Sequence, residues 1–441
     1  MDAKPFAIHR IVIRLVSFMP VGKGYQMSHT GVGRTRAKGT KDMANISTEF
    51  DFDTIIPRLG TGSSKWDMLE TLFGSKDVLP LWVADMDFAA PEAVSRRVIE
   101  RAQHPIYAYN TQEPSLRQAI IEWVARRHHW NIKDEWIVLT PGVVPAVIFS
   151  ILALSNPGDG VIIQPPVYTP FFNSIRDNDR EIVENPLVSK NGRYEIDFAD
   201  LEQKLAIRKN RLLLFCSPHN PVGRVWTKQE LARVAELCHR YGTDILSDEI
   251  HDDLVFRGHQ HTVFASLDTP ASEQIVTFMA ASKTFNLAGL NFSYMVIPCP
   301  RRRALLEACI NRLHLRRNNL FGVLATEAAY RGGEVWLDAL LQYLEANADT
   351  VVDFVHQRLP GVKVVKPEGT YLAWLDFRAH IPEATALKNF LMQKAKVGLN
   401  WGETYGRQGE GFARLNFAAP RSRVLEALTR IERALHGEIR G

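Results

Sequence analysis

The chain has 441 residues, more than one typical domain contains, and its 46% hydrophobic and 10% aromatic residues can fill the cores of two domains packed together. The formal net charge of +4 is too small to favour a nucleic-acid-binding protein. The four cysteines lack CxxC spacing, which predicts reduced thiols in a cytoplasmic protein, and no apolar run approaches the roughly 18–20 residues that a membrane span needs.

The first 48 residues differ from the rest of the chain. They are basic and rich in glycine and serine, and we expect either a disordered extension or a true start at Met27 or Met43. An apolar patch at residues 11–19 is interrupted by Arg14 and lacks a small-residue cleavage site, which makes a secretory signal a poor alternative.

The next elements are a short strand with a turn at residues 79–88 and two helices at residues 91–103 and 115–129. The second helix ends in His128 and His129. Because adjacent residues of a helix point in different directions, we interpret this pair as a polar helix end and not as a metal site.

A strand at residues 137–140 then runs into a helix, with Gly142 at the junction. Free N–H groups at a helix start, aided by the helix dipole, can bind a phosphate group. The chain has no GxGxxG motif, so a dinucleotide site has little support. A further strand is predicted at residues 161–164, and Tyr168 follows its carboxyl end.

Three more strands are predicted at residues 212–215, 243–251 and 275–280. Between the first two, Thr227 and Glu230 make a capping box, which predicts a helix that a glycine ends. A strand–helix–strand unit makes its two strands parallel, so their carboxyl ends should lie at the same edge of the sheet.

Asn220, Asp248 and Lys283 each follow the carboxyl end of one of these strands. Ligands of open α/β sheets bind at this edge. The simpler interpretation of Lys283 is that it marks where its strand reaches water. An amine, a carboxylate and an amide in one crevice instead fit pyridoxal phosphate (PLP), whose aldehyde, ring nitrogen and phenolic oxygen they can bind.

Three motifs carry a family resemblance: SPHNPVGR at residues 217–224, LSDEIHDDL at 246–254 and ASKTFNLAGL at 281–290. From about Arg58 onward the chain resembles the fold-type I PLP enzymes, and among them the MalY/PatB-type carbon–sulfur β-lyases, also described as cystathionine β-lyases. The resemblance implies an α/β fold with a mostly parallel central sheet, helices on both of its faces and a smaller α/β domain. It also implies a homodimer with active sites at the subunit interface.

The domain boundaries follow from the same resemblance. We expect residues 49–90 to form an N-terminal arm that belongs to the small domain, residues 91–320 the large PLP-binding domain, and residues 321–441 the C-terminal small domain. Residues 1–48 precede the resemblance.

The resemblance implies roles for individual residues. Lys283 forms a Schiff base with the cofactor and later removes a proton, Asp248 keeps the ring nitrogen protonated, and Asn220 bonds the phenolic oxygen. Tyr168 stacks on the pyridine ring, although a core tyrosine is the alternative. Arg414 clamps the α-carboxylate of the substrate, although a solvated surface charge is the usual state of a single arginine.

The residues that bind the cofactor phosphate should differ from those of aminotransferases. Those enzymes usually carry an arginine eight residues after the lysine, where this chain has Asn291, and a tyrosine where it has His251. Ala280 replaces their serine three residues before the lysine. The phosphate should instead bind to the backbone N–H groups of Gly142, Val143 and Val144, to Ser282 and, from the neighbouring subunit, to Tyr109. Tyr109 also borders the substrate in this scheme, with a packing tyrosine as the alternative.

In the C-terminal part we expect a connecting helix at about residues 301–331, a second long helix at 334–359, and strands at 362–365, 371–377 and 411–417. The pair His259 and His261 lacks further ligands at suitable spacing, so we interpret it as a surface loop without a metal.

Three functions remain as hypotheses. The first is β-elimination of an amino-acid thioether, an L-cysteine S-conjugate such as cystathionine, to a thiol, pyruvate and ammonia. The second is an aminotransferase with the same cofactor, which would need a keto-acid acceptor. The third is a regulatory protein that uses the fold as a scaffold and the basic extension as a contact. We expect no metal, nucleic-acid or membrane partner.

Overall fold

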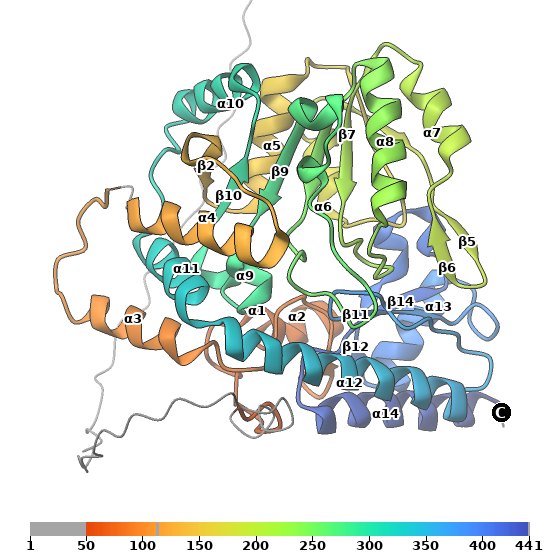
Figure 1. Ribbon diagram of the computed structural model, residues 1–441. Coiled ribbons are helices and arrows are strands. Elements are labelled where there is room, and N and C mark those ends of the chain that lie inside the picture. The colour runs from red at the N-terminus through yellow and green to blue at the C-terminus, as the bar shows by residue number, and fades with distance from the viewer. Residues whose placement is uncertain (1–49, 112–113, 440–441) are drawn as a thin grey trace, which may run out of the picture. The chain divides into compact units, whose positions relative to one another are not determined.

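A seven-stranded sheet lies at the centre of the computed structural model, which describes residues 50–111 and 114–439 (Figure 1). The predicted extension at residues 1–48 lies outside the described residues. In spatial order the strands are β2 (Ile137–Thr140), β10 (Ser293–Val296), β9 (Ile275–Met279), β8 (Asp244–Asp248), β7 (Asn210–Cys216), β3 (Gly160–Ile163) and β4 (Glu181–Glu184). Among these seven strands only β10 runs in the opposite direction to the other six, so the sheet is mostly parallel, as predicted.

Helices cover both faces of this sheet (Figure 1). Successive residues of β7 show why both faces must be covered. Leu212 and Leu214 join the core on one face, whereas Leu213 and Phe215 join the core on the other. Strands that are apolar on both sides are typical of a parallel sheet between helical layers. One layer contains α5 (Val143–Leu154), α6 (Pro170–Arg176) and α10 (Pro300–Arg312), and the other contains α4 (Pro114–His128), α7 (Phe198–Leu205) and α8 (Lys228–Tyr241).

The predicted strand–helix–strand unit is confirmed. Thr227 and Glu230 form the capping box at the start of α8, and Gly242 ends the helix with a left-handed φ of 69°. β7 and β8 are parallel, with Cys216 opposite Asp248, and β9 continues in the same direction, with Phe278 opposite Asp248. The carboxyl ends of the three strands therefore share one edge of the sheet.

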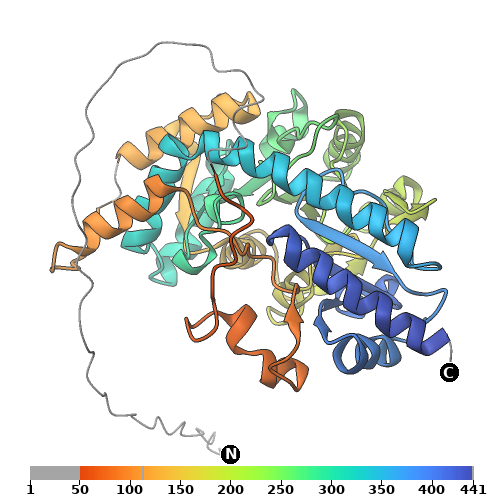
Figure 2. The ribbon, with the colours of Figure 1, turned by 90° about the horizontal axis from the view of Figure 1, so that it is seen from below.

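A second, smaller sheet lies in the C-terminal part of the chain. Its antiparallel strands are β11 (Leu372–Asp376), β14 (Phe412–Asn416) and β13 (Asn400–Trp401). The long helices α12 (Glu334–Arg358) and α14 (Arg421–Ile439) lie side by side in this part (Figure 2). β1 (Leu79–Pro80) pairs in parallel with β12 (Val397–Gly398), which attaches the N-terminal arm here. The domain boundaries at residues 49–90, 91–320 and 321–441 stay predictions.

The remaining described elements are short or peripheral. They are α1 (Ser64–Asp67), α2 (Leu69–Phe73), α3 (Glu92–Ala102), β5 (Val188–Lys190), β6 (Arg193–Glu195), α9 (Ala281–Thr284), α11 (Leu320–Gly332) and α13 (Ala384–Asn389). α11 packs against α3 and α4. Among the described helices, none is long and apolar enough to span a bilayer.

Two predicted elements are wrong. The single connecting helix at residues 301–331 is two helices, α10 and α11, because His314 adopts a left-handed φ of 56° that an α-helix cannot continue. Residues 362–365 form no strand. Only Lys363 pairs with β11, through mutual hydrogen bonds with Asp376.

The N-terminal arm is held by a buried ion network. The side chain of Lys65 is 0% exposed, and its Nζ lies 2.9 Å from Asp87 and 3.4 Å from Asp85. Arg58 contacts the same two carboxylates, at 2.6 Å each. Although burial raises the pKa of Asp87, the charges of Lys65 and Arg58 outweigh it and hold that pKa below its usual value.

We predict that Lys65→Met destabilises the protein by about 3–5 kcal/mol, because it removes the fully buried ammonium that pairs with the buried carboxylate of Asp87. Urea unfolding, followed by tryptophan fluorescence, measures the change. The matched control is Lys76→Met. Lys76 pairs with Glu70 where both side chains are exposed, 74% and 67%, so its loss should change the unfolding free energy by less than about 1 kcal/mol. Equal effects of the two substitutions would contradict a structural role for the network.

Candidate active site

A cavity of about 620 Å³ lies at the shared carboxyl edge of β7, β8 and β9 and extends to the small sheet. It brings together ten of the eleven predicted site residues. They are Gly142, Val143, Val144, Tyr168, Asn220, Asp248, His251, Ser282, Lys283 and Arg414. Tyr109 does not line the cavity and is 84% exposed, with the guanidinium of Arg317 stacked 3.9 Å from its ring centroid.

Lys283 lies in α9, the short helix that follows β9. Its Nζ donates a hydrogen bond of 2.6 Å to the carbonyl oxygen of Ala84. Burial, together with the charge of Arg414, lowers the pKa of Lys283 to about 8, although Asp85 and Asp248 act in the opposite direction. The amine is therefore a far better nucleophile and base near neutral pH than an ordinary lysine. Lys283 is half-buried in the cavity wall and hydrogen-bonded to the main chain, so it does more than mark where its strand reaches water.

Asp248 ends β8 and is only 3% exposed. Burial raises the pKa of its carboxyl to about 7, against the lowering effects of the Ile250 N–H and of Lys283. The role predicted for Asp248, to keep a ring nitrogen protonated, requires an ionised carboxylate beside that nitrogen. Such a cation would lower this pKa, so the carboxyl is suited to a positively charged partner.

Arg414 projects from β14 and is 3% exposed, so its interpretation as a solvated surface charge is wrong. Nη1 donates to Asn220 Oδ1 at 3.1 Å, and Nη2 donates to the Trp82 carbonyl at 2.6 Å and to Asn400 Oδ1. Its Nε has no hydrogen-bond partner among the described residues. The guanidinium thus faces the cavity as a rigid, only partly satisfied donor.

Two rings complete the centre of the cavity. Burial raises the pKa of Tyr168 to about 12, so its hydroxyl stays protonated. Burial, Lys283 and Arg414 lower the pKa of His251, which is therefore neutral near pH 7, and its Nδ1 has no partner among the described residues. The His251 ring packs edge to face against Tyr371, with centroids 5.8 Å apart.

The part of the cavity that could bind a phosphate group lies at the start of α5. Gly142 precedes this helix with φ 155°, and Val143 and Val144 are its first two residues. Ser282 and Asn291 border the same cavity. First-turn N–H groups of a helix lack intrahelical partners and can donate to an anion.

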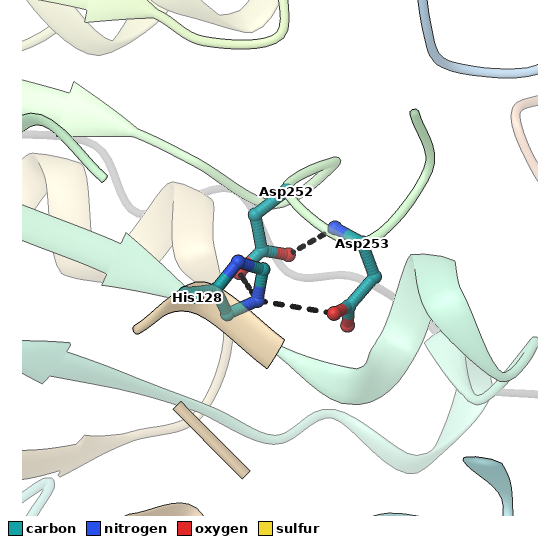
Figure 3. A group of neighbouring side chains, drawn as sticks. All are labelled: His128, Asp252 and Asp253. Atoms are coloured by element: carbon teal, nitrogen blue, oxygen red, sulfur yellow. Dashed lines mark hydrogen bonds and ion pairs between the residues drawn. The ribbon is translucent and has the colours of Figure 1, made fainter. Parts of the chain in front are cut away.

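Two histidine predictions need correction. His261 does not lie on the surface, because its Nε2 pairs with the buried Glu249 at 2.8 Å, although His259 is exposed. The side chain of His128 is 4% exposed and is not a polar helix end; it lies between Asp252 and Asp253 (Figure 3). In both cases a distant carboxylate compensates for burial of the imidazole.

Residues 76–431 match the family model described as aminotransferase class I and II. The chain belongs to this family. A relative in the family is the cystathionine beta-lyase PatB of Bacillus subtilis, 45% identical over 87% of this chain and 100% of the relative. Protein MalY of Escherichia coli is 34% identical over 85% of this chain and 96% of the relative. Cystalysin from Treponema denticola, whose crystal structure contains PLP, superposes with a TM-score of 0.86 and 38% identity over 88% of this chain and 99% of cystalysin. The predicted fold-type I architecture is confirmed.

Within this family member, sequence reasoning did not identify the Ala84 carbonyl as the hydrogen-bond partner of the Lys283 amine. The carbonyl of Ala84 also accepts a hydrogen bond from the Tyr371 hydroxyl at 2.9 Å. Asn286 Nδ2 donates to the carbonyls of Met86 and Phe88, both at 2.9 Å. The position of Asn286 in the ASKTFNLAGL motif could have indicated its role. The role of the Ala84 carbonyl could not be predicted in this way, because every residue has a carbonyl group.

The lowered pKa of Lys283 makes a prediction for the protein without bound PLP, in which the amine of Lys283 is free. Acylation requires the free amine, so the rate at which acetic anhydride acetylates Lys283 should rise with pH to a midpoint of about 8. Ordinary lysines titrate near 10.4. Peptide mass spectrometry across pH 6–11 measures each lysine separately, and the exposed lysines provide the internal reference. A Lys283 profile that coincides with theirs would show that burial does not depress its pKa.

Proposed function

We propose that the protein is a PLP-dependent carbon–sulfur β-lyase that acts on L-cysteine S-conjugates, cystathionine-like thioethers, and releases a thiol, pyruvate and ammonia. One observation carries the proposal: Lys283, Asp248 and Arg414 line a single cavity although they come from three different strands or strand ends. The relatives support it, since PatB is named a cystathionine beta-lyase and the cystalysin structure contains PLP.

The donor set of the cavity fits this cofactor. It offers a primary amine, a buried carboxyl group and an amide, and two of its buried nitrogens, His251 Nδ1 and Arg414 Nε, have no partner among the described residues. When bound, PLP supplies an aldehyde that captures the substrate's amine and a ring that takes up electrons. We assign Lys283 to the aldehyde, Asp248 to the ring nitrogen and Asn220 to the phenolic oxygen.

The remaining assignments concern the ring face and the phosphate. Tyr168 covers the ring face, and His251 lies beside the phenolic-oxygen side. The phosphate group would be bound by the N-terminus of α5 and by polar groups near Lys283: Gly142, Val143, Val144 and Ser282, with Tyr109 supplied by a second subunit.

The protein's own residues then perform the proton chemistry. Arg414 binds the α-carboxylate of the substrate and fixes the orientation of Cα. Lys283, whose pKa of about 8 leaves part of it unprotonated at neutral pH, removes the Cα proton. The Cβ–S bond breaks and sulfur leaves with the electron pair. With one water molecule, the thioether yields the thiol, pyruvate and ammonium.

The aminotransferase alternative has weaker support. Aminotransferases usually bind the phosphate with an arginine at the position of Asn291, and Asn291 here borders the cavity with a left-handed φ of 47°. His251 replaces their tyrosine. The regulatory alternative relies on residues 1–48, which lie outside the described part of the chain, and it leaves the intact set of Lys283, Asp248 and Arg414 without a use.

We also infer a homodimer in the cytoplasm. Tyr109 is 84% exposed, and apolar side chains are exposed near it in the chain, Ile106 at 62% and Tyr107 at 60%. Such a group is suited to a subunit interface. The four cysteines are buried and unpaired, which suits a reducing compartment. The two-domain division stated above belongs to the same proposal.

The proposed reaction predicts pyruvate formation from cystathionine without any added keto acid. Lys283→Ala should lower the rate at least about 100-fold, because it removes both the covalent anchor and the proton acceptor. A lactate dehydrogenase-coupled assay measures pyruvate directly. Lys76→Ala, at an exposed lysine, is the matched control and should keep wild-type activity. Turnover that depends on a keto acid would favour the aminotransferase instead.

Arg414→Lys should lower kcat/KM by about 10–150-fold, mainly through KM, because a lysine cannot form two parallel bonds to a carboxylate and loses about 1.5–3 kcal/mol. Steady-state kinetics with cystathionine measures the effect. The control is Arg378→Lys, whose side chain is 56% exposed, and it should leave KM unchanged. A decrease confined to kcat would place Arg414 outside carboxylate binding.

A further inference from the structure

A second group of ionisable side chains lies outside the active-site cavity and contacts α9 (Ala281–Thr284) through Thr284. His128, the last residue of α4, places Nε2 3.2 Å from Asp252 Oδ2 and 3.0 Å from Asp253 Oδ1 (Figure 3). The three side chains are 4%, 4% and 1% exposed. None of them lines the cavity, so the proposed reaction does not use them directly.

The group touches both chain segments that carry the reactive residues. Asp252 and Asp253 lie in the turn that follows Asp248 and His251. Asp253 Oδ2 accepts a hydrogen bond of 2.9 Å from the hydroxyl of Thr284, the residue next to Lys283. It also accepts one of 3.3 Å from Trp123 Nε1, one turn earlier in α4.

Two carboxylates this close together cannot both stay ionised in a buried place without a cation. The cations and imidazoles that face them are His128, Arg127 from the same helix, and His261, whose ring lies 5.9 Å from that of His128. His261 is paired with Glu249, and Arg127 contacts Asp338 at 2.9 Å. Although burial lowers the pKa of His128, the two carboxylates raise it to about 10, so the imidazole is charged at neutral pH.

We propose that His128 is a positioning residue: its charged imidazole keeps Asp253 ionised, and Asp253 through Thr284 holds α9 so that the amine of Lys283 stays in its buried position. The Lys283 position is thus fixed by two contacts, one from its own amine to the Ala84 carbonyl and one from the neighbouring Thr284 hydroxyl to Asp253. The kinetic part of this inference rests on the proposed function, whereas the placement of Lys283 does not.

The first test uses His128→Asn in the full chain, with His129→Asn as the matched control. His129 is exposed and has a left-handed φ of 54°, which asparagine tolerates. In His128→Asn the two carboxyl groups lose the imidazole that contacts both of them and repel each other, which displaces Asp253 and weakens the Thr284 anchor. The acetylation midpoint of Lys283 should then rise from about 8 by roughly one pH unit toward the ordinary value of about 10.4. His129→Asn should leave the midpoint unchanged.

A rescue variant separates the charge effect from lost packing. In His128→Asn/Asp252→Asn a single carboxylate remains, so Asp253 can stay ionised without the imidazole. The Lys283 midpoint should return to within a few tenths of a unit of wild type. A midpoint that stays shifted in the double variant, or one that never shifts in His128→Asn, overturns the proposal.

Thr284→Val tests the other end of the contact and keeps the proposal testable if His128→Asn does not fold. The substitution keeps the shape of the side chain and removes the hydroxyl donor to Asp253. It should shift the Lys283 midpoint in the same direction and, in the PLP-loaded enzyme, lower kcat about tenfold with KM for cystathionine changed less than about twofold. An unchanged midpoint overturns the proposal even if the enzyme proves to catalyse another reaction.

A metal ion is the competing occupant, because the three ligand-type atoms lie within 4.8 Å of one another. Elemental analysis of the purified wild-type protein and titration with Zn²⁺ and Mn²⁺ decide between them. The imidazole-carboxylate pairing predicts less than about a tenth of an equivalent of bound metal and no metal-dependent change in the Lys283 midpoint. One equivalent of metal that is lost in His128→Asn overturns the proposal.

Discussion

The active site depends on one irregular stretch of main chain, residues 82–88, that must be hydrogen-bonded without belonging to a sheet. Buried carbonyls need donors, and here side chains supply them. Arg414 donates to Trp82, Lys283 and Tyr371 to Ala84, Asn416 to Val83 and Asp85, and Asn286 to Met86 and Phe88. Most of these donors project from the helix after β9 or from β14, so this stretch joins the edge of the large sheet to the small sheet.

Arg414 and Lys283 therefore have a structural role in addition to their proposed chemical roles. The Arg414 guanidinium, which faces the cavity, donates a hydrogen bond to the Trp82 carbonyl of the cavity wall. The Lys283 amine, which is proposed to bind the cofactor, donates one to the Ala84 carbonyl of the same wall. The wall is in turn anchored by Lys65 and Arg58 through Asp85 and Asp87. A rigid, internally satisfied wall preorganises the charged groups, and preorganised charge is what most transition-state stabilisation requires.

The buried ionisable groups in the cavity differ from those around it in how fully a partner of opposite charge compensates them. Burial moves the pKa values of Lys283 and Asp248 toward neutrality, to about 8 and about 7, so Lys283 can accept a proton near physiological pH and Asp248 favours a positively charged partner. Around them, the other buried ionisable groups are paired: Glu249 with His261, and Asp252 and Asp253 with His128. The reactive groups are those that the protein leaves only partly compensated.

The sequence by itself determined the parallel edge at which Asn220, Asp248 and Lys283 meet, because strand periodicity, the capping box of α8 and the βαβ rule are local or near-local signals. It did not determine the end of α10 near His314, the failure of residues 362–365 to form a strand, or the burial of His128 and His261. Nor did it reveal that carbonyls of residues 82–88 complete the site. Those features are set by partners that are distant in the chain, such as Asp253 for His128 and Arg414 for Trp82, and only tertiary packing brings such pairs within hydrogen-bonding distance.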